Sequence, residues 1–219
     1  MLRFKLLRYP VTIQNGAFVL AGIVLLFGLQ YGSVRAPLTW IGIGFVSLMV
    51  HELGHAVTAD LFRLGPIDIR LTQMGGLTRH RRPSKPWQML LIALAGPGAG
   101  LALAAVALVV AIAMPDGLIQ ELAQDVVYLN LLWSVFNLLP LFPMDGGMAT
   151  SSILQMITTT WAWPITWVLG FTLSIFMALW AFASGEIFIA LFGALFASNN
   201  GQALWAWNKR RAPPATRAG

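Results

Sequence analysis

The chain has 219 residues, of which 58% are hydrophobic and only 10% charged, and its mean hydropathy is +0.73. An ordinary soluble domain carries about 25% charged residues, so this composition excludes a soluble enzyme or a disordered chain and indicates a membrane protein. The sequence contains no cysteine, which excludes disulfides, thiol nucleophiles and cysteine metal ligands. Any bound metal must therefore be held by His, Asp or Glu.

Six apolar stretches are predicted to cross the bilayer, for which a helix needs about 20 residues. They lie at about 16–30, 38–60, 86–114, 118–157, 162–183 and 186–207. The predicted fold is an all-α polytopic membrane protein with about six transmembrane helices, in which residues 1–208 form a single domain. The basic, proline-rich residues 209–219 are expected to form a disordered tail.

The net charge of +6 is explained by where the basic residues lie along the chain. Thirteen of the 14 Lys and Arg residues precede the first stretch, follow the last, or lie between the second and third, whereas Arg35 alone falls on the other side. The positive-inside rule assigns such basic segments to the cytoplasm. We therefore expect a multi-pass protein of the cell membrane with cytoplasmic termini and no nucleic-acid partner.

The connection between the second and third stretches is long enough to hold structure of its own. Within residues 61–86, the segments IDIRLTQ and GLTRH alternate roughly between polar and apolar residues, and Met74, Gly75 and Gly76 lie where the two segments meet. This pattern predicts a small membrane-associated β-hairpin. The segment YPVTI before the first stretch can add a strand to it.

The fourth stretch is predicted to be broken. Pro140 and Pro143 each lack a backbone N–H and obstruct the preceding turn, so a regular helix cannot run from Asn137 through Asp145. Irregular backbone at membrane depth is tolerated only where protein or a water-filled cavity surrounds it. The break is therefore a candidate position for a functional site.

The third stretch contains AGPGAG at residues 95–100, in which Gly96 and Gly100 have small-xxx-small spacing. Within an apolar span, this spacing lets another helix approach closely. The segment is therefore interpreted as a helix-packing feature and not as a phosphate-binding loop.

The second stretch contains an H-E-x-x-H motif formed by His51, Glu52 and His55. On a helix the two histidines lie one turn apart on one face, so both can bind one tetrahedral Zn²⁺ while Glu52 serves as the base for its water. Polar residues satisfied within a helix bundle are the alternative. A central carboxylate alone costs about 2.5 to 3.5 kcal/mol on insertion, however, so a compensating partner is required. One zinc ion per chain is the predicted partner.

A catalytic zinc site needs a third protein ligand and an open position for water. His80 lies among arginines in the cytoplasmic loop, where a solvated side chain is the simpler interpretation. Asp145 lies inside NLLPLFPMDGG in the broken stretch. At 1.5 Å per residue, His51 is roughly 14 to 18 Å and Asp145 roughly 20 Å from the same membrane face, so the two can meet. Asp145 can also simply cap the helix that starts at Gly146, so both interpretations stay open.

The sequence resembles the site-2 protease family of intramembrane zinc metalloproteases. The resemblance rests on HELGHA, on NLLPLFPMDGG about ninety residues later, on the AGP of the third stretch and on the glycine hairpin. It implies that His51, His55 and Asp145 bind zinc and that Glu52 is the catalytic base.

The same resemblance implies a substrate and further site residues. Asn137 is expected near the substrate carbonyl, and the hairpin at Gly75 and Gly76 is expected to contact the substrate backbone. The implied activity is zinc-dependent cleavage of transmembrane helices of other proteins within the lipid bilayer. Many relatives carry a PDZ or CBS module, for which 219 residues leave no room, so a compact form is expected.

Two other classes of protein fit part of this pattern. An ion-coupled transporter also uses broken helices and intramembrane ionisable residues, although six spans without an inverted repeat argue against it. A non-catalytic relative that binds membrane proteins would be indicated by the loss of Glu52 or of a ligand, and all four residues are present. Stoichiometric zinc together with cleavage separates a protease from both classes.

Overall fold

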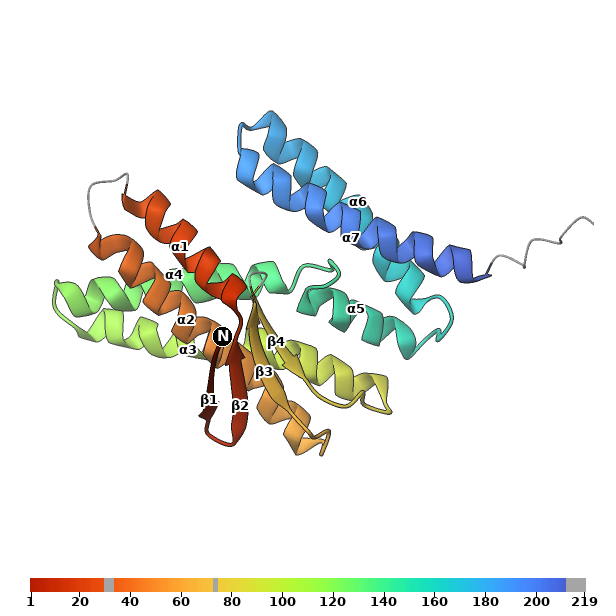
Figure 1. The fold of residues 1–219 in the computed structure, drawn as a ribbon, viewed down its shortest axis with the longest axis horizontal. Helices are drawn as coiled ribbons and strands as arrows, with labels where there is room; N and C mark the ends of the chain where they lie inside the picture. Colours follow the sequence, from red (N-terminus) through yellow and green to blue (C-terminus); the bar gives the residue numbers. More distant parts are fainter. Residues whose placement is uncertain (30–33, 73–74, 212–219) are drawn as a thin grey trace, which may run out of the picture. The chain divides into compact units, whose positions relative to one another are not determined.

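The computed structural model describes residues 1–29, 34–72 and 75–211, which form seven helices and four strands (Figure 1). The chain divides into two compact units, Met1–Asn137 and Leu138–Gly219. The single domain expected over residues 1–208 stays a prediction.

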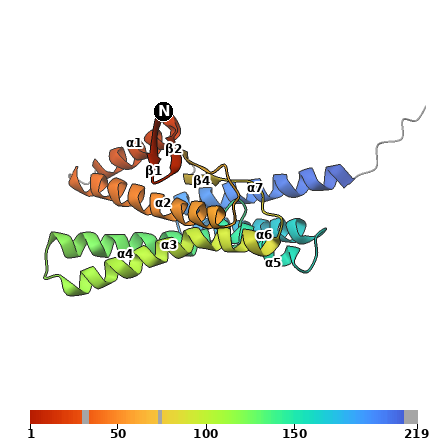
Figure 2. The ribbon, with the colours of Figure 1, turned by 90° about the horizontal axis from the view of Figure 1, so that it is seen from below.

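The first unit contains a four-stranded sheet and four helices. Helix α3 packs against both α2 and α4, and Figure 2 shows the long antiparallel pair of α3 and α4. A Cβ atom at Gly100 would lie 2.7 Å from Ser134 Oγ on α4, so the close helix approach predicted there is confirmed. In chain order the elements are β1 (Leu2–Leu6), β2 (Tyr9–Ile13), α1 (Asn15–Leu29), α2 (Arg35–Leu61), β3 (Asp68–Thr72), β4 (Gly75–Arg79), α3 (Pro86–Ala113) and α4 (Leu118–Asn137).

The sheet has the strand order β1-β2-β3-β4. Strands β3 and β4 pair antiparallel with Leu71 opposite Gly76, and β2 pairs parallel to β3, so the predicted hairpin and the added strand are confirmed. Strand β1 pairs antiparallel with β2 and was not predicted. Its alternation of apolar Leu2, Phe4 and Leu6 with basic residues is a strand pattern, but the charges suggested only the flank of a membrane span.

One face of the sheet packs on α2. Successive side chains of a strand point to opposite faces, and the alternate residues of the two central strands are buried. The sheet is thereby fixed to the half of α2 that carries the H-E-x-x-H motif. The buried cluster contains Tyr9, Val11 and Ile13 of β2, Ile69 and Leu71 of β3, and Met49, Ala56 and Ala59 of α2.

The second unit contains α5 (Asp145–Gln155), α6 (Ala162–Ala183) and α7 (Ile187–Arg211). Because α4 ends at Asn137 and α5 begins at Asp145, the helix break predicted between them is present. Helices α6 and α7 form an antiparallel pair (Figure 1). Helix α7 continues three residues past the boundary expected at residue 208, and residues 212–219 of the predicted tail lie outside the described residues.

Among the described residues, four helices are long and apolar enough to cross a membrane, namely α2, α3, α6 and α7. Helix α1 is described over 15 residues, and α4 carries polar side chains such as Glu121 and Asp125 along its 20 residues. The number of six spans is therefore not confirmed and stays a prediction.

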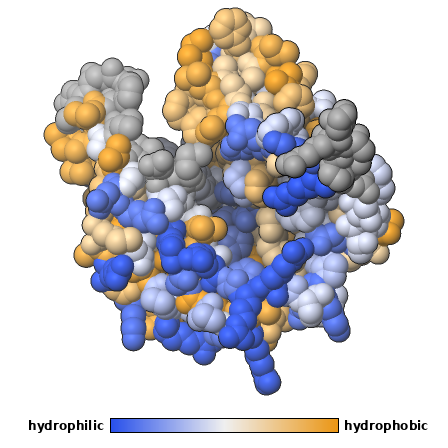
Figure 3. Space-filling model, turned by 45° about the vertical axis from the view of Figure 1, so that its right-hand side comes forward, coloured by the Kyte–Doolittle hydropathy of each residue, from blue (hydrophilic) through white to orange (hydrophobic). Residues whose placement is uncertain are grey.

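Many large apolar side chains are exposed on the candidate spans. On α6 these include Phe176, Leu179 and Trp180. The space-filling view shows large hydrophobic areas beside a group of hydrophilic side chains (Figure 3). Exposed apolar areas of this extent are expected where helices contact lipid, which agrees with an integral membrane protein.

Candidate metal centre

Two histidines and one glutamate of α2 form the candidate centre. His51, Glu52 and His55 are 4%, 3% and 7% exposed, and one ligand atom from each lies within 4.8 Å of the other two. All three belong to a helix whose length and composition suit a membrane span. The helical repeat therefore brings the motif together as the sequence predicts.

The imidazole rings of the two histidines converge. The Nε2 atoms of His51 and His55 lie 3.1 Å apart, and the rings meet edge to face. Two nitrogens bound to one tetrahedral zinc ion at about 2.0 to 2.1 Å would lie roughly 3.3 Å apart. The observed separation therefore fits a shared zinc ion.

A backbone carbonyl of α3 fixes the tautomer of His55. The Nδ1 atom of His55 lies 2.7 Å from the carbonyl oxygen of Ile92. A carbonyl can only accept a hydrogen bond, so Nδ1 carries the proton and donates it. In the neutral ring, Nε2 then keeps its lone pair for a metal. A bond of this kind also orients the ligand, as is usual for metal-binding histidines.

Glycines let α3 approach the histidines closely. A Cβ atom at Gly96 would lie 2.8 Å from His51 Nε2 and even closer to the His55 ring. On α2, a Cβ atom at Gly54 would lie 2.8 Å from the carbonyl carbon of Ala95. The glycine at position 96 therefore keeps clear the space beside both Nε2 atoms, where a metal ion would bind.

Glu52 is held by strand β4. The Thr78 hydroxyl donates to Glu52 Oε2 at 2.7 Å, and its oxygen also lies 3.1 Å from the backbone oxygen of Glu52. A Cβ atom at Gly76 would overlap the Glu52 carboxyl group. Gly75 has a φ of +115°, in the region that favours glycine. The predicted site residues Gly75 and Gly76 thus belong to a strand that covers Glu52.

A further contact anchors the sheet to α2 near the motif. Arg8 forms an ion pair with Asp60, and the Tyr9 hydroxyl donates to Asp60 Oδ2 at 3.0 Å. The hydrogen bond with Tyr9 and the charge of Asp60 raise the pKa of Arg8, so its guanidinium stays charged at neutral pH. Because Arg8 is exposed, the ion pair itself contributes little stability. Tyr9 is itself buried in the cluster between the sheet and α2, and its partner Asp60 follows His55 by five residues.

Asp145 is the first residue of α5 in the second unit. The preceding loop folds back over the first turn of this helix. A Cβ atom at Gly147 would lie 2.6 Å from the Leu141 oxygen, and one at Gly146 would overlap the Leu138 oxygen. The two glycines of the DGG sequence are thus required for this close approach. The role of Asp145 as third zinc ligand stays a prediction.

Two other residues named from the sequence make contacts within their own segments. Asn137 is the last residue of α4, and its Nδ2 donates to the Trp133 oxygen at 2.9 Å. Its role near a substrate carbonyl stays a prediction. The Nδ1 atom of His80 lies 2.7 Å from the Arg81 oxygen, and His80 lies outside the group of potential metal ligands on α2.

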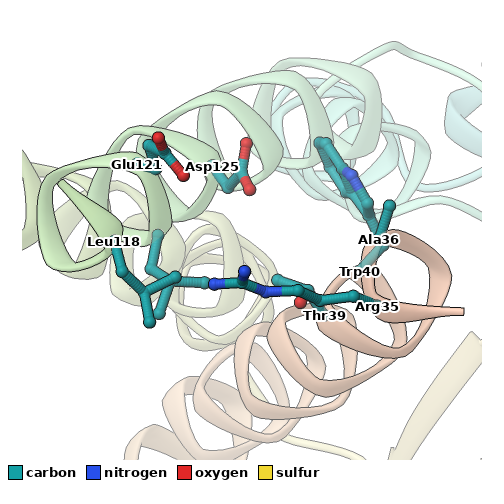
Figure 4. A pocket seen from close by; sticks show the side chains of 8 residues that line it. Arg35, Ala36, Thr39, Trp40, Leu118, Glu121 and Asp125 are labelled. Atoms are coloured by element: carbon teal, nitrogen blue, oxygen red, sulfur yellow. The ribbon is translucent and has the colours of Figure 1, made fainter. Parts of the chain in front are cut away.

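A pocket of about 270 Å³ opens between the first turns of α2 and α4 (Figure 4). Arg35, Glu121 and Asp125 supply its charged groups, and Trp40 forms part of its wall. Arg35 precedes His51 by 16 residues, or roughly 24 Å along a helix. The pocket is therefore separate from the histidine pair.

Comparisons with known proteins agree with this geometry. Residues 39–127, which contain the H-E-x-x-H motif, match the model of Peptidase family M50. A zinc metalloprotease of Methanocaldococcus jannaschii is 28% identical over 153 residues, which cover 69% of this chain and 44% of that protein. A protein of Synechocystis sp. named as a candidate zinc metalloprotease is 34% identical over 118 residues, which cover 52% of this chain and 31% of that protein.

The fold also resembles a solved structure. The site-2 protease from Methanocaldococcus jannaschii superposes with a TM-score of 0.71 at 23% identity, covering 100% of this chain and 99% of that one. Residues 39–127 therefore resemble Peptidase family M50, and the fold resembles that of a site-2 protease, which confirms the resemblance predicted from the sequence. The chain spans less than half the length of each of the two curated relatives.

Proposed function

We propose that this protein is a zinc-dependent intramembrane endopeptidase that cleaves membrane-spanning segments of other membrane proteins. The proposal is carried by the convergence of His51 and His55 at an Nε2 separation of 3.1 Å, with the Glu52 carboxylate beside them. All three lie in an apolar helix long enough to cross a membrane. This position supports hydrolysis of peptide bonds within membrane-spanning helices.

His51, His55 and Asp145 would hold one zinc ion and leave the fourth position open for water. Three observations support the histidines in this role: the spacing of their Nε2 atoms, the hydrogen bond between His55 Nδ1 and the Ile92 oxygen, and the glycine at position 96. A zinc ion bound there supplies Lewis acidity toward a water molecule and a peptide carbonyl.

Glu52 acts as the general base and then as the general acid. Its carboxylate accepts a proton from the attacking water and passes it to the leaving amine. The Thr78 hydroxyl donates to Oε2 and so holds the carboxylate in one orientation during this transfer. Glu52 is 3% exposed and lies beside the two histidines, within reach of a water molecule bound there.

The substrate is a membrane-spanning helix that unwinds around the cleaved bond. Helical hydrogen bonds hide the peptide carbonyl, and lipid offers few other partners, so the segment must leave helical geometry. Strand β4 is an edge strand in the sheet order, and its residues Gly76 and Thr78 face Glu52. An extended substrate segment can pair with this edge by strand addition.

Two measurements test the proposal together. The zinc content is determined for purified wild type, His51→Ala and Glu52→Gln, and membrane-protein fragments are compared in cells that express each form. We expect about one zinc ion per chain in wild type and Glu52→Gln, little zinc in His51→Ala, and fragments with wild type alone. Glu52→Gln is the matched control because it removes the base and keeps the ligands.

Each alternative gives a different result. Full zinc content in His51→Ala would show that the histidine pair does not bind the metal. Equal fragment levels with wild type and Glu52→Gln would show that the protein is not the protease. A transporter or a non-catalytic binding protein would produce no fragments, so zinc together with cleavage separates the protease from both.

A further inference from the structure

A buried amide on α7 holds the backbone of the loop that leads to Asp145. Asn200 is 0% exposed. Its Nδ2 donates to the backbone oxygens of Phe142 at 2.9 Å and Phe196 at 2.8 Å, and its Oδ1 accepts the Phe142 N–H at 3.3 Å. The side chain thus pairs with both polar backbone groups of one loop residue, as a neighbouring strand would.

The loop needs such a partner because prolines break the helix. Pro140 and Pro143 have no N–H to donate, and each obstructs helical bonding in the preceding turn. Backbone groups that are freed in an apolar environment are costly unless another group pairs with them. Asn200 supplies that partner from a position 58 residues later in the chain.

Helix α6 leaves room for the amide. A Cβ atom at Gly170 would lie 2.8 Å from Asn200 Cγ and closer still to Oδ1. Any larger residue at position 170 would therefore press against the amide and disturb its bonds with Phe142. Helices α6 and α7 and the proline-containing loop all meet at this one side chain within the second unit.

Phe142, the residue bound by Asn200, lies three positions before Asp145. The backbone between these two residues has little conformational freedom. The Met144 N–H donates to the Leu141 oxygen at 2.7 Å. Pro143 fixes its own φ angle. A displacement of Phe142 is therefore transmitted to the first residue of α5.

We infer that Asn200 is a positioning residue for Asp145, because it clamps Phe142 and so fixes where the carboxylate is presented. The inference rests on the proposed function, which requires Asp145 to bind zinc. Groups that orient metal ligands typically contribute 10- to 100-fold to metal affinity. An amide that merely packed two helices would leave the zinc affinity unchanged.

The zinc affinity of the purified chain in detergent is measured by competition with a chromogenic chelator. Asn200→Leu keeps the approximate size of the side chain and removes its three hydrogen bonds. Gly170→Ala keeps Asn200 and crowds its amide. Both variants should bind zinc about 10- to 100-fold more weakly than wild type.

Gly193→Ala is the matched control for packing. Its Cβ atom would lie 2.8 Å from the Ala178 backbone nitrogen, so it overpacks the same α6–α7 interface at a different place. We expect a lower melting temperature with wild-type zinc affinity. The inference is overturned if Asn200→Leu also keeps wild-type affinity, or if Gly193→Ala weakens zinc binding as much as Gly170→Ala.

His51→Ala in the same assay separates this inference from the proposed function. Loss of zinc in His51→Ala with wild-type affinity in Asn200→Leu overturns the role of Asn200 alone. Wild-type affinity in His51→Ala overturns the metal site and, with it, the role of Asn200. If Asn200→Leu does not fold, the affinity of Gly170→Ala decides the question.

Discussion

The hydroxyl of Thr78 on β4 lies 2.7 Å from Oε2 of Glu52 on α2. Gly76, two residues earlier on the same strand, faces the same carboxyl group. Since alternate residues of a strand share one face, one side of β4 covers Glu52. The sheet is therefore a structural part of the candidate site.

Replacing the Thr78 hydroxyl should impair catalysis without removing the metal. A hydrogen bond to a charged group contributes about 1.5 to 3 kcal/mol, so Thr78→Val should lower turnover by about 10- to 100-fold. Thr78→Ser retains the hydroxyl and should retain most of the activity. Turnover on a cleaved membrane substrate and zinc content are measured for both. Wild-type turnover in Thr78→Val would show that Glu52 does not need this bond.

A methyl group at position 96 should exclude the metal. The Cβ atom of Gly96→Ala would fall 2.8 Å from His51 Nε2 and closer to the His55 ring, in the space assigned to zinc. Gly98→Ala is the matched control on the same helix, because its Cβ atom would meet nothing within 4 Å. We expect low zinc content in the first variant and wild-type content in the second. Equal zinc content in both would place the metal elsewhere.

The H-E-x-x-H geometry could be predicted from the sequence because it is local. Residues four apart on a helix share a face whatever surrounds them, and His51 and His55 do converge. The β3–β4 hairpin and the helix break were predictable for the same reason. Glycine and proline limit the backbone of their own segment.

The groups that support the site could not be predicted, because distant segments bring them together. Thr78 reaches Glu52 across 26 residues, and Asn200 reaches Phe142 across 58. Neither residue belongs to a motif. One indication was present in the sequence, and only for Asn200. A polar side chain in an apolar stretch of helix α7 requires a hydrogen-bond partner if it is buried.

Asn137→Ala separates contact with the reaction intermediate from bracing of the backbone. An amide has two N–H groups, and one of those on Asn137 donates to the Trp133 oxygen. If the amide also stabilises the intermediate, turnover should fall by about 10² to 10³. Asn130→Ala, two turns earlier on α4, is the control for a lost buried amide. Unchanged turnover with a lower melting temperature in Asn137→Ala would assign it to bracing.

The orientation of the chain can be tested with single cysteines, because the sequence contains none of its own. Thirteen of 14 basic residues lie in segments assigned to the cytoplasm, which predicts cytoplasmic termini and a cytoplasmic connection between α2 and α3. Ser84 is exposed in that connection, and Asp116 is exposed between α3 and α4. The two positions should therefore lie on opposite sides of the membrane.

A membrane-impermeant thiol reagent distinguishes these positions. Asp116→Cys should be labelled in intact cells, whereas Ser84→Cys should be labelled only after the cytoplasmic side is exposed. His51 lies roughly 14 to 18 Å from the α2–α3 connection, so water must reach this depth. The non-helical connection between α2 and α3, together with the sheet, can line an entrance for water on the cytoplasmic side. Labelling of Ser84→Cys in intact cells would reverse the orientation, and water would then have to enter from the outer face.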